Sequence, residues 1–165
     1  MEKREHTAAE ARNLANSYDI VASAKVLKFS DSLKFTRAAV RLRKGAEAAI
    51  GAEEEVLRKK LEPIRDEIRS YLEKEDLAGE ALEKELSTRL AEHSEAKEVL
   101  AQIQELWNQK IEVEYTVPEV SAEDIRDDAE PVQVSFGGAA GSYVDPYTVL
   151  RNLYTREEVK IVGEE

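Results

Sequence analysis

Four cationic side chains recur at a spacing that places them on one face of a helix. At 100° per residue they fall within an arc of about 80°, and apolar residues occupy the opposite side. Such a row of cations can bind the phosphates of a nucleic acid, an anionic membrane surface or an acidic protein surface. This basic stripe consists of Lys34, Arg37, Arg41 and Lys44, opposite Phe35, Ala39, Leu42, Ala46 and Ala49.

The stripe lies in a segment whose charge opposes that of the chain. Residues 20–46 hold seven Lys or Arg and one acid within a 165-residue chain of net charge -11. Residues 112–165 hold 13 acids and four basic residues. Because the sequence itself contains an acidic region, we rank an acidic protein surface first among the three possible partners. The most direct candidate is residues 119–130 of a neighbouring copy, which include Asp127 and Asp128. Nucleic acid ranks lower, and the Ala-rich apolar side is a poor lipid anchor, so no membrane partner is expected.

Residues suited to catalysis or metal binding are few, and those present do not have the spacing of a known motif. The chain has no Cys, and its two histidines are His6 and His93, which excludes disulfides, Cys-based zinc sites and thiol catalysis. The acidic run 123–130 lacks the alternating ligands and central Gly of an EF-hand. The Gly-rich run 136–142 lacks the Lys-Ser/Thr pair of a P-loop and the dinucleotide fingerprint. We therefore expect no enzyme, metal, cofactor or small-molecule substrate, and we expect His93 to be a residue of the helical seam with a local hydrogen bond.

The single tryptophan, Trp107, stands where a helical pattern gives way to a strand pattern. Tryptophan is enriched at binding hot spots, so Trp107 is a candidate anchor for a partner. The alternative, which we favour, is a packing role that joins the helical part of the chain to the part that follows.

Two helical stretches are predicted before residue 72. Thr7 and Glu10 have the form of a capping box and open a helix that extends to about residue 28. The residues at 30–32 are N-cap candidates for the next helix. Its apolar stripe runs from about residue 33 to 72 and is interrupted only by Pro63, where we expect a kink or a restart of the helix.

A third stretch, at 82–107, again carries apolar residues at steps of three and four. The polar break at 73–79 joins it to the second stretch, which predicts a long antiparallel helical hairpin resembling a coiled coil. Leu86 and Leu100 are expected on its buried seam. Gly45 and Gly51 within the second stretch indicate close approach of another backbone, which we assign to the N-terminal helix, with a groove that receives another subunit as the alternative.

After residue 110 the hydrophobic pattern changes to a period of two. Ile111, Val113 and Tyr115 alternate with polar residues, as in a half-buried strand. An acidic connector is expected at 121–130. A second strand, a flexible loop, a short helix with Asp145-Pro146 at its start and a last strand are predicted at 132–136, 137–142, 145–153 and 159–162.

The predicted fold is therefore mainly α. A helical hairpin region with an N-terminal helix spans 1–110, and a small acidic part with short strands and a short helix spans 111–165. No apolar run approaches the roughly 18 residues of a membrane span, and no signal-peptide core follows Met1, which predicts an intracellular protein.

Four segments, in this order, resemble a family of small tailed-phage helical-hairpin proteins of unknown function. The likeness covers roughly residues 29–125. It implies a viral, non-catalytic protein in the cytoplasm of a host cell or in the virion, and it carries over no site residues. The segments are LKFTRAAVRLRKGAE, EEEVLRKKLEPIRDEIRSYLEKE, IQELWNQKIEVEY and the terminal PYTVLRNLY.

We predict from these features a non-enzymatic structural or assembly protein. It would act through protein–protein contacts, either by self-association or within a viral assembly. Two alternatives stay open. One is an acidic inhibitor that mimics DNA in the nucleic-acid groove of a host enzyme, which requires one continuous acidic surface. The other is a nucleic-acid-binding accessory protein that uses the basic stripe.

Overall fold

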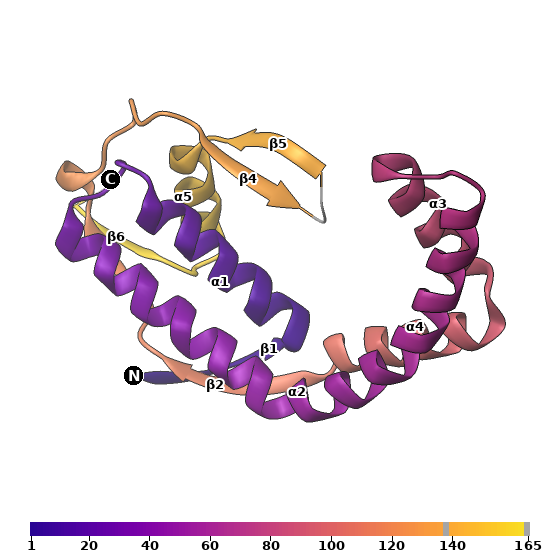
Figure 1. Ribbon diagram of the computed structural model, residues 1–165. Helices are drawn as coiled ribbons and strands as arrows, with labels where there is room; N and C mark the ends of the chain where they lie inside the picture. The colour runs from indigo at the N-terminus through magenta and orange to yellow at the C-terminus, as the bar shows by residue number, and fades with distance from the viewer. Residues whose placement is uncertain (137–138, 164–165) are drawn as a thin grey trace. The chain divides into compact units, whose positions relative to one another are not determined.

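The computed structural model describes residues 1–136 and 139–163, and the protein is mainly helical (Figure 1). The helices are α1 (Ala8–Ser23), α2 (Phe29–Lys74), α3 (Gly79–Glu92), α4 (Ser94–Trp107) and α5 (Pro146–Thr155). The strands are β1 (Glu2–Thr7), β2 (Lys110–Tyr115), β3 (Glu119–Ser121), β4 (Val132–Phe136), β5 (Ala139–Val144) and β6 (Lys160–Val162). They form the two-stranded sheets β1–β2 and β4–β5, both antiparallel, and β3–β6, which is parallel.

The chain folds into two compact units. The first contains residues 1–46 and 110–165, the second contains residues 47–109, and α2 contributes to both. The expected division after residue 110 lies next to one of these boundaries. The assignment of the first 46 residues to the helical region differs from the structure, because β1 pairs with β2 and α1 packs on α5. The N-terminal residues therefore belong with the C-terminal part.

The β1–β2 ribbon holds the first unit together. Its register runs from Glu2 opposite Tyr115 to Thr7 opposite Lys110. β2 has the alternating burial that its sequence predicts. β1 was not expected, because the segment EKREHT carries no apolar alternation. Its partly buried face presents Arg4 and His6 instead.

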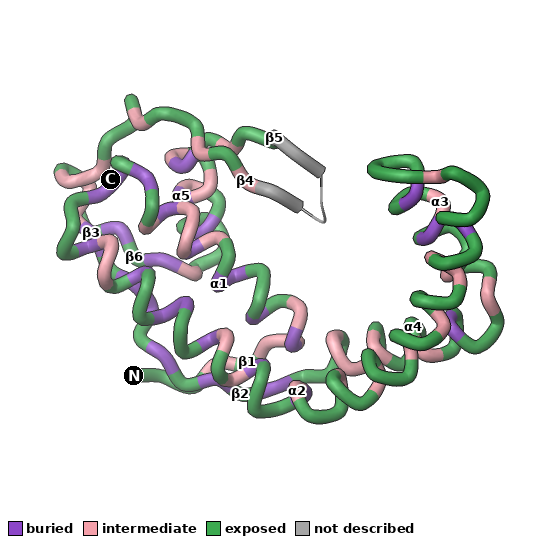
Figure 2. The backbone as a smooth tube through the Cα atoms, viewed as in Figure 1, coloured by how far each residue is buried: buried purple, intermediate pink, exposed green. Residues whose placement is uncertain are grey.

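The core of the first unit is built from large side chains of α1, α2, β2 and α5 (Figure 2). The rings of Tyr18 and Phe35 pack edge to face with 5.5 Å between their centroids. Gly45 allows β2 to approach α2, since a Cβ at this position would lie 2.9 Å from Cγ2 of Val113. The close approach indicated by Gly45 is therefore made by β2, not by the N-terminal helix.

The N-terminal ends of α1 and α5 follow local signals in the sequence. Thr7 and Glu10 form the predicted capping box, with Glu10 N donating to Thr7 Oγ1 at 3.1 Å. Asp145 caps α5 by accepting a hydrogen bond from the Tyr147 N–H at 3.3 Å. α1 ends at Ser23, earlier than expected, and α2 begins at Phe29, before the predicted caps.

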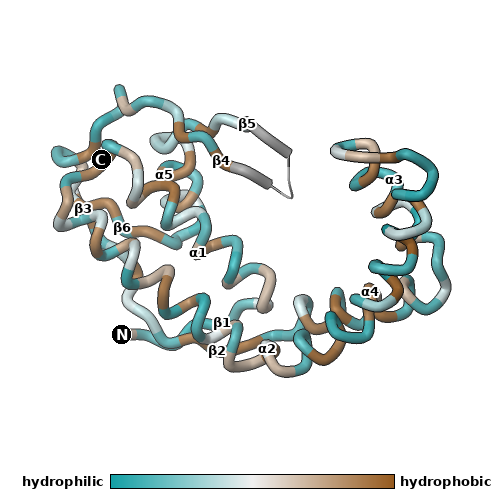
Figure 3. The backbone as a smooth tube through the Cα atoms, viewed as in Figure 1, coloured by the Kyte–Doolittle hydropathy of each residue, from teal (hydrophilic) through white to brown (hydrophobic). Residues whose placement is uncertain are grey.

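Helix α2 continues through Pro63 without the expected restart. Proline removes one hydrogen bond of a helix, but the residues around it are strong helix formers. Ion pairs one turn apart support the preceding turns, such as Glu54 with Arg58 and Glu55 with Lys59. Polar and apolar residues alternate along this helix at helical spacing (Figure 3).

The helix expected at 82–107 is divided at His93. The residue has extended backbone angles and caps both neighbours, ending α3 and opening α4. Its Nδ1 accepts a hydrogen bond from the Ala96 N–H at 3.3 Å, which is the expected local hydrogen bond.

A small apolar core joins α2 to α3 within the second unit. Leu72, Leu82 and Leu86 are buried there and are supported by Ile68, Leu77 and Leu90. Leu100 on α4 is 37% exposed, so its expected place on a buried seam was wrong. The break at His93 ends the continuous stripe on which that expectation depended.

The C-terminal strands and short helix follow the predicted order. β4, α5 and β6 occupy the expected segments, whereas β3 within the acidic region was not expected. Residues 137 and 138 of the predicted flexible loop lie outside the described residues, and from residue 139 the chain forms β5.

No helix in the described part of the chain combines the length and hydrophobicity that a membrane span requires. The same residues contain no group of three or more His, Asp or Glu arranged to hold a metal ion.

The difference in burial between Leu86 and Leu100 gives a first test of the second unit. Leu86→Ala should lower the free energy of unfolding by about 2–5 kcal/mol, because Leu86 is fully buried. Leu100→Ala should cost less than about 1 kcal/mol. Urea denaturation followed by the fluorescence of Trp107, which lies in the same unit, measures both losses. Equal losses at the two sites would contradict the break at His93.

The two glycines of α2 give a second test. Gly51→Ala should stabilise the protein by up to about 1 kcal/mol, since helix propensity improves and the added Cβ meets only the flexible side chain of Glu47. Gly45→Ala should instead destabilise it by about 1–3 kcal/mol, because the stiff Val113 side chain must shift. Thermal denaturation followed by circular dichroism compares the two. If Gly45→Ala stabilised the protein, β2 would not pack against α2 at this residue.

Candidate functional site

The four residues of the basic stripe lie exposed along the N-terminal half of α2. The residues opposite them, Phe35, Ala39, Leu42 and Ala46, are buried, as the helical spacing predicted, whereas Ala49 is exposed. The face that packs and the face that carries charge are therefore assigned correctly over residues 34–46.

Two contacts fix how the stripe lies against the chain that forms β2 and β3. Gly45 of α2 lies against Val113 in β2. Eleven residues earlier, Lys34 Nζ donates a hydrogen bond to the Glu119 carbonyl oxygen at 2.9 Å. α2 thus runs antiparallel to residues 113–119, and the stripe flanks this segment along its length.

The members of the stripe differ in their partners. Lys34 forms an ion pair with the carboxylate of Asp31 at 3.1 Å in addition to its bond to Glu119. Asp31 is 3% exposed, and its Oδ2 accepts no hydrogen bond within the described structure. Arg37, Arg41 and Lys44 make no ion pair or hydrogen bond with any described residue. Three of the four charges are therefore free to meet a partner.

Two adjoining hollows lie beside the stripe in the first unit. One has a volume of about 610 Å³ and is lined by Arg37, Arg41, Lys44 and residues 112–114 of β2. The other has a volume of about 500 Å³ and is lined by Lys34, Arg37, Arg41, Lys160 and residues 116–119. Arg37 and Arg41 line both, so we treat the two hollows together as one groove, whose lining also includes the acids Glu112, Glu114 and Glu119. Lys160 was not expected here, since only the pairing of β3 with β6 brings it near.

The acidic connector is partly used within its own chain. Lys28 Nζ pairs with the Asp124 carboxylate at 2.8 Å, and this hydrogen bond raises the pKa of Lys28. The Arg126 N–H donates to the Val26 carbonyl oxygen at 2.9 Å. Asp127 and Asp128 are exposed, and neither pairs with a described residue. The structure therefore does not bring them to the stripe of the same chain.

Trp107 is the last residue of α4 and is partly buried. Its neighbour Leu106 lines an open apolar hollow of about 780 Å³ in the second unit, together with Ala52, Val56 and Leu57. Whether Trp107 anchors a partner stays a prediction.

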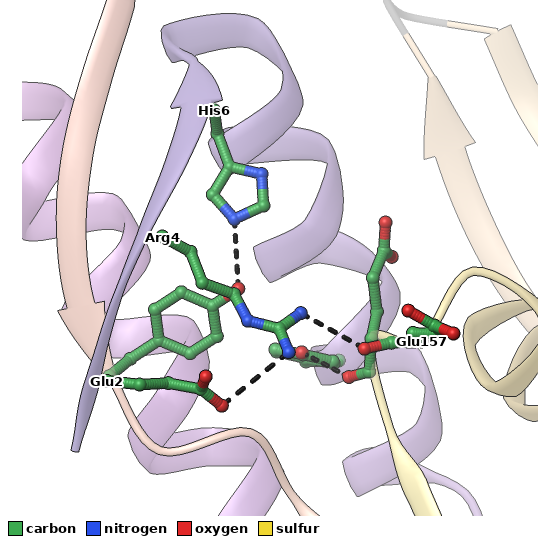
Figure 4. Close-up of polar contacts among 7 residues, drawn as sticks. Glu2, Arg4, His6 and Glu157 are labelled. Atoms are coloured by element: carbon green, nitrogen blue, oxygen red, sulfur yellow. Dashed lines mark hydrogen bonds and ion pairs between the residues drawn. The ribbon is translucent and has the colours of Figure 1, made fainter.

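A polar cluster that was not predicted ties the N-terminal strand to the turn before β6 (Figure 4). His6 Nε2 and the Tyr115 hydroxyl lie 2.9 Å apart, and the Tyr18 hydroxyl donates to the Glu158 carbonyl oxygen at 2.6 Å. Arg4 donates to the Glu157 carbonyl oxygen at 3.0 Å. The sequence analysis placed Tyr115 as an inward residue of β2 but gave no signal for these hydrogen bonds. These contacts fasten β1 to β2 and to the turn before β6.

Burial determines the titration of this cluster. It lowers the pKa of His6 from its usual 6.5, against the attraction of Glu10 and with a further lowering from Arg4. It raises the pKa of Tyr115 and of the Glu158 carboxyl. Burial also raises the pKa of Tyr18, so both tyrosines stay neutral hydrogen-bond donors at neutral pH.

The lowered pKa of His6 predicts a loss of stability in mild acid. Between about pH 6.5 and the lower pKa of the folded state, the unfolded chain binds more protons, so the free energy of unfolding falls as pH falls. The raised pKa of Glu158 acts in the opposite direction from about pH 4.5 upward. The His6→Gln variant keeps a hydrogen-bonding group and should lose the slope below pH 6.5. Denaturation at pH 7 and pH 5.5 measures it, and an unchanged slope would show that His6 does not titrate on unfolding.

Comparisons with protein-family models, with curated proteins and with solved structures find nothing that matches this chain.

Proposed function

We propose that the protein is a non-enzymatic assembly or structural protein that binds an acidic protein surface through the basic stripe. The observation that carries this proposal is the state of Arg37, Arg41 and Lys44. In a chain of net charge -11, these neighbouring cations form no ion pair with any described residue.

The energetics favour a partner with several acids. A single exposed ion pair contributes only about 0–1 kcal/mol, so three or four pairs must act together. The screening length is about 10 Å at 0.1 M salt, so a partner at the groove senses the cations and acids that line it more than the charges elsewhere on the protein. Binding through the stripe would therefore weaken as salt is raised.

The wider role rests on the same proposal. The Leu72–Leu82–Leu86 core and the ion pair between Arg69 and Glu83 at 3.0 Å support a helical hairpin of α2 and α3 that acts as a spacer. The partner is a second copy of the chain or another component of a viral assembly, in a host cell or a virion. For a second copy, the available acids are Asp127 and Asp128, since Asp124 is already paired with Lys28.

The two alternative functions, nucleic-acid binding and DNA mimicry, require different charged surfaces. A nucleic acid would use the same stripe, so it is distinguished by experiment. A DNA mimic needs a continuous acidic surface. The ion pairs between Glu54 and Arg58, and between Glu85 and Arg89, interrupt the acids of α2 and α3 with cations.

Charge reversal on α2 tests the proposal. The double variant R37E/R41E should bind poly-L-glutamate at least tenfold more weakly than the unaltered protein at about 0.1 M salt. The matched control K59E/K60E makes the same change in net charge on the same helix, in the second unit, and should bind as the unaltered protein does. Titration calorimetry measures each affinity.

Two further measurements separate the partner classes. If R37E/R41E keeps its affinity for poly-L-glutamate but loses binding to a DNA duplex in a gel-shift assay, the nucleic-acid alternative replaces the proposal. If light scattering shows an oligomer that R37E/R41E dissociates and the added D127K/D128K restores, the acidic partner is a second copy.

A further inference from the structure

The outer edge of β2 is an unpaired strand edge. β2 belongs to a two-stranded sheet, so only one of its edges is paired with β1. In an antiparallel pair, every second residue directs its N–H and C=O away from the partner strand. No hydrogen bond from a described residue reaches these outward groups of residues 110–115. Such a row of donors and acceptors is a template for another strand.

The basic stripe flanks this edge and the chain that continues it. Gly45 lies at Val113, and Lys34 lies at Glu119. Residues 34–45 of a helix extend over about 16 Å, and residues 113–119 of an extended chain over about 20 Å. Arg37, Arg41 and Lys44 line the same hollow as residues 112–114. A strand placed on the free edge would therefore meet cations along its length.

The two faces of the ribbon differ in charge. Ile111, Val113 and Tyr115 face the core under the helices, whereas Glu112 and Glu114 lie on the exposed face. A third strand would alternate its side chains between these faces. Every second side chain would point toward the stripe, and the others would lie beside Glu112 and Glu114, where like charges in neighbouring strands repel.

We propose that a partner protein binds by adding an extended acidic segment to the outer edge of β2 as a third strand. Its acids occupy alternate positions, on the face toward Arg37, Arg41 and Lys44, and uncharged or basic side chains lie between them. Main-chain hydrogen bonds supply affinity and the alternation supplies specificity, as in other cases of strand addition. This inference rests on the proposed function and identifies the form of the acidic partner.

The spacing of the cations supports this form. Arg37 and Arg41 are separated by about 6 Å along the helix, and alternate residues of a strand by about 7 Å. One acid of the added strand can therefore meet each arginine. The connector of a second copy fits less well, because a strand through it would place Arg126 on the same face as Asp128 and Glu130. The occupant is accordingly a segment of a different protein.

Peptides of one composition and two orders test strand addition. The first is a blocked ten-residue peptide that alternates Glu and Thr. The second contains five Glu and five Thr in the order Glu-Glu-Thr-Thr-Glu-Glu-Thr-Thr-Glu-Thr, which cannot place all acids on one face of a strand. The full-length protein should bind the alternating peptide at least tenfold more tightly, measured by titration calorimetry at about 0.1 M salt. A peptide of residues 124–131 should bind more weakly than the alternating peptide.

Backbone N-methylation tests the main-chain contacts. In a strand, the N–H groups of the Glu residues point to one edge and those of the Thr residues to the other. N-methylation of one set should abolish binding, and N-methylation of the other set should leave it within about twofold. Binding to a disordered surface would respond to both sets alike.

The outcomes for strand addition and for the proposed function are distinguishable. If the two peptide orders bind equally and R37E/R41E loses both, strand addition is overturned while the acidic-partner function stands. If R37E/R41E binds both peptides as the control K59E/K60E does, the proposed function fails as well. Equal binding of the 124–131 peptide would overturn the assignment of the occupant to a different protein.

Discussion

The pairing of β1 with β2 is the interaction on which the first unit depends. It joins residues 2–7 to residues 110–115 and so closes a loop of about a hundred residues. The loop-closure entropy must be offset by contacts that exist only once the strands meet. These include the burial of Tyr115, its hydrogen bond with His6, and the bond from Arg4 to the Glu157 carbonyl oxygen. β1 contacts α1, and α1 in turn packs on α5, so the ribbon links residues 110–115 to both helices.

The same ribbon determines where the cations of α2 lie. Val113 packs into the space that Gly45 leaves open, and this contact aligns the helix with residues 113–119. At the other end, Lys34 forms an ion pair with Asp31 and donates a hydrogen bond to the Glu119 carbonyl oxygen, so one of the four cations is already paired within the fold. The remaining three are left beside a free strand edge. The position of the three unpaired cations is thus a consequence of how a helix packs on a strand.

The second unit is organised by short-range contacts. Residues 75–78 separate α2 from α3, and Leu72, Leu82 and Leu86 form a small core beside them. His93 divides the following helical segment by satisfying the backbone groups of both neighbours. Leu100, beyond this break, is consequently exposed. A hydrophobic stripe at helical spacing does not by itself say that the stripe is covered.

The sequence alone determined the features that arise from neighbouring residues. The capping box at Thr7, the cap at Asp145, the alternation of β2 and the division of α2 into basic and buried faces follow from local hydrogen bonds and from periodicity. The tertiary structure decided features that depend on residues far apart in the chain. β1 has no apolar pattern and is a strand only because β2 supplies its partner and because Arg4 and His6 find polar partners. The place of Lys160 in the groove likewise follows from the β3–β6 pairing, and no local pattern encodes a pairing across some forty residues.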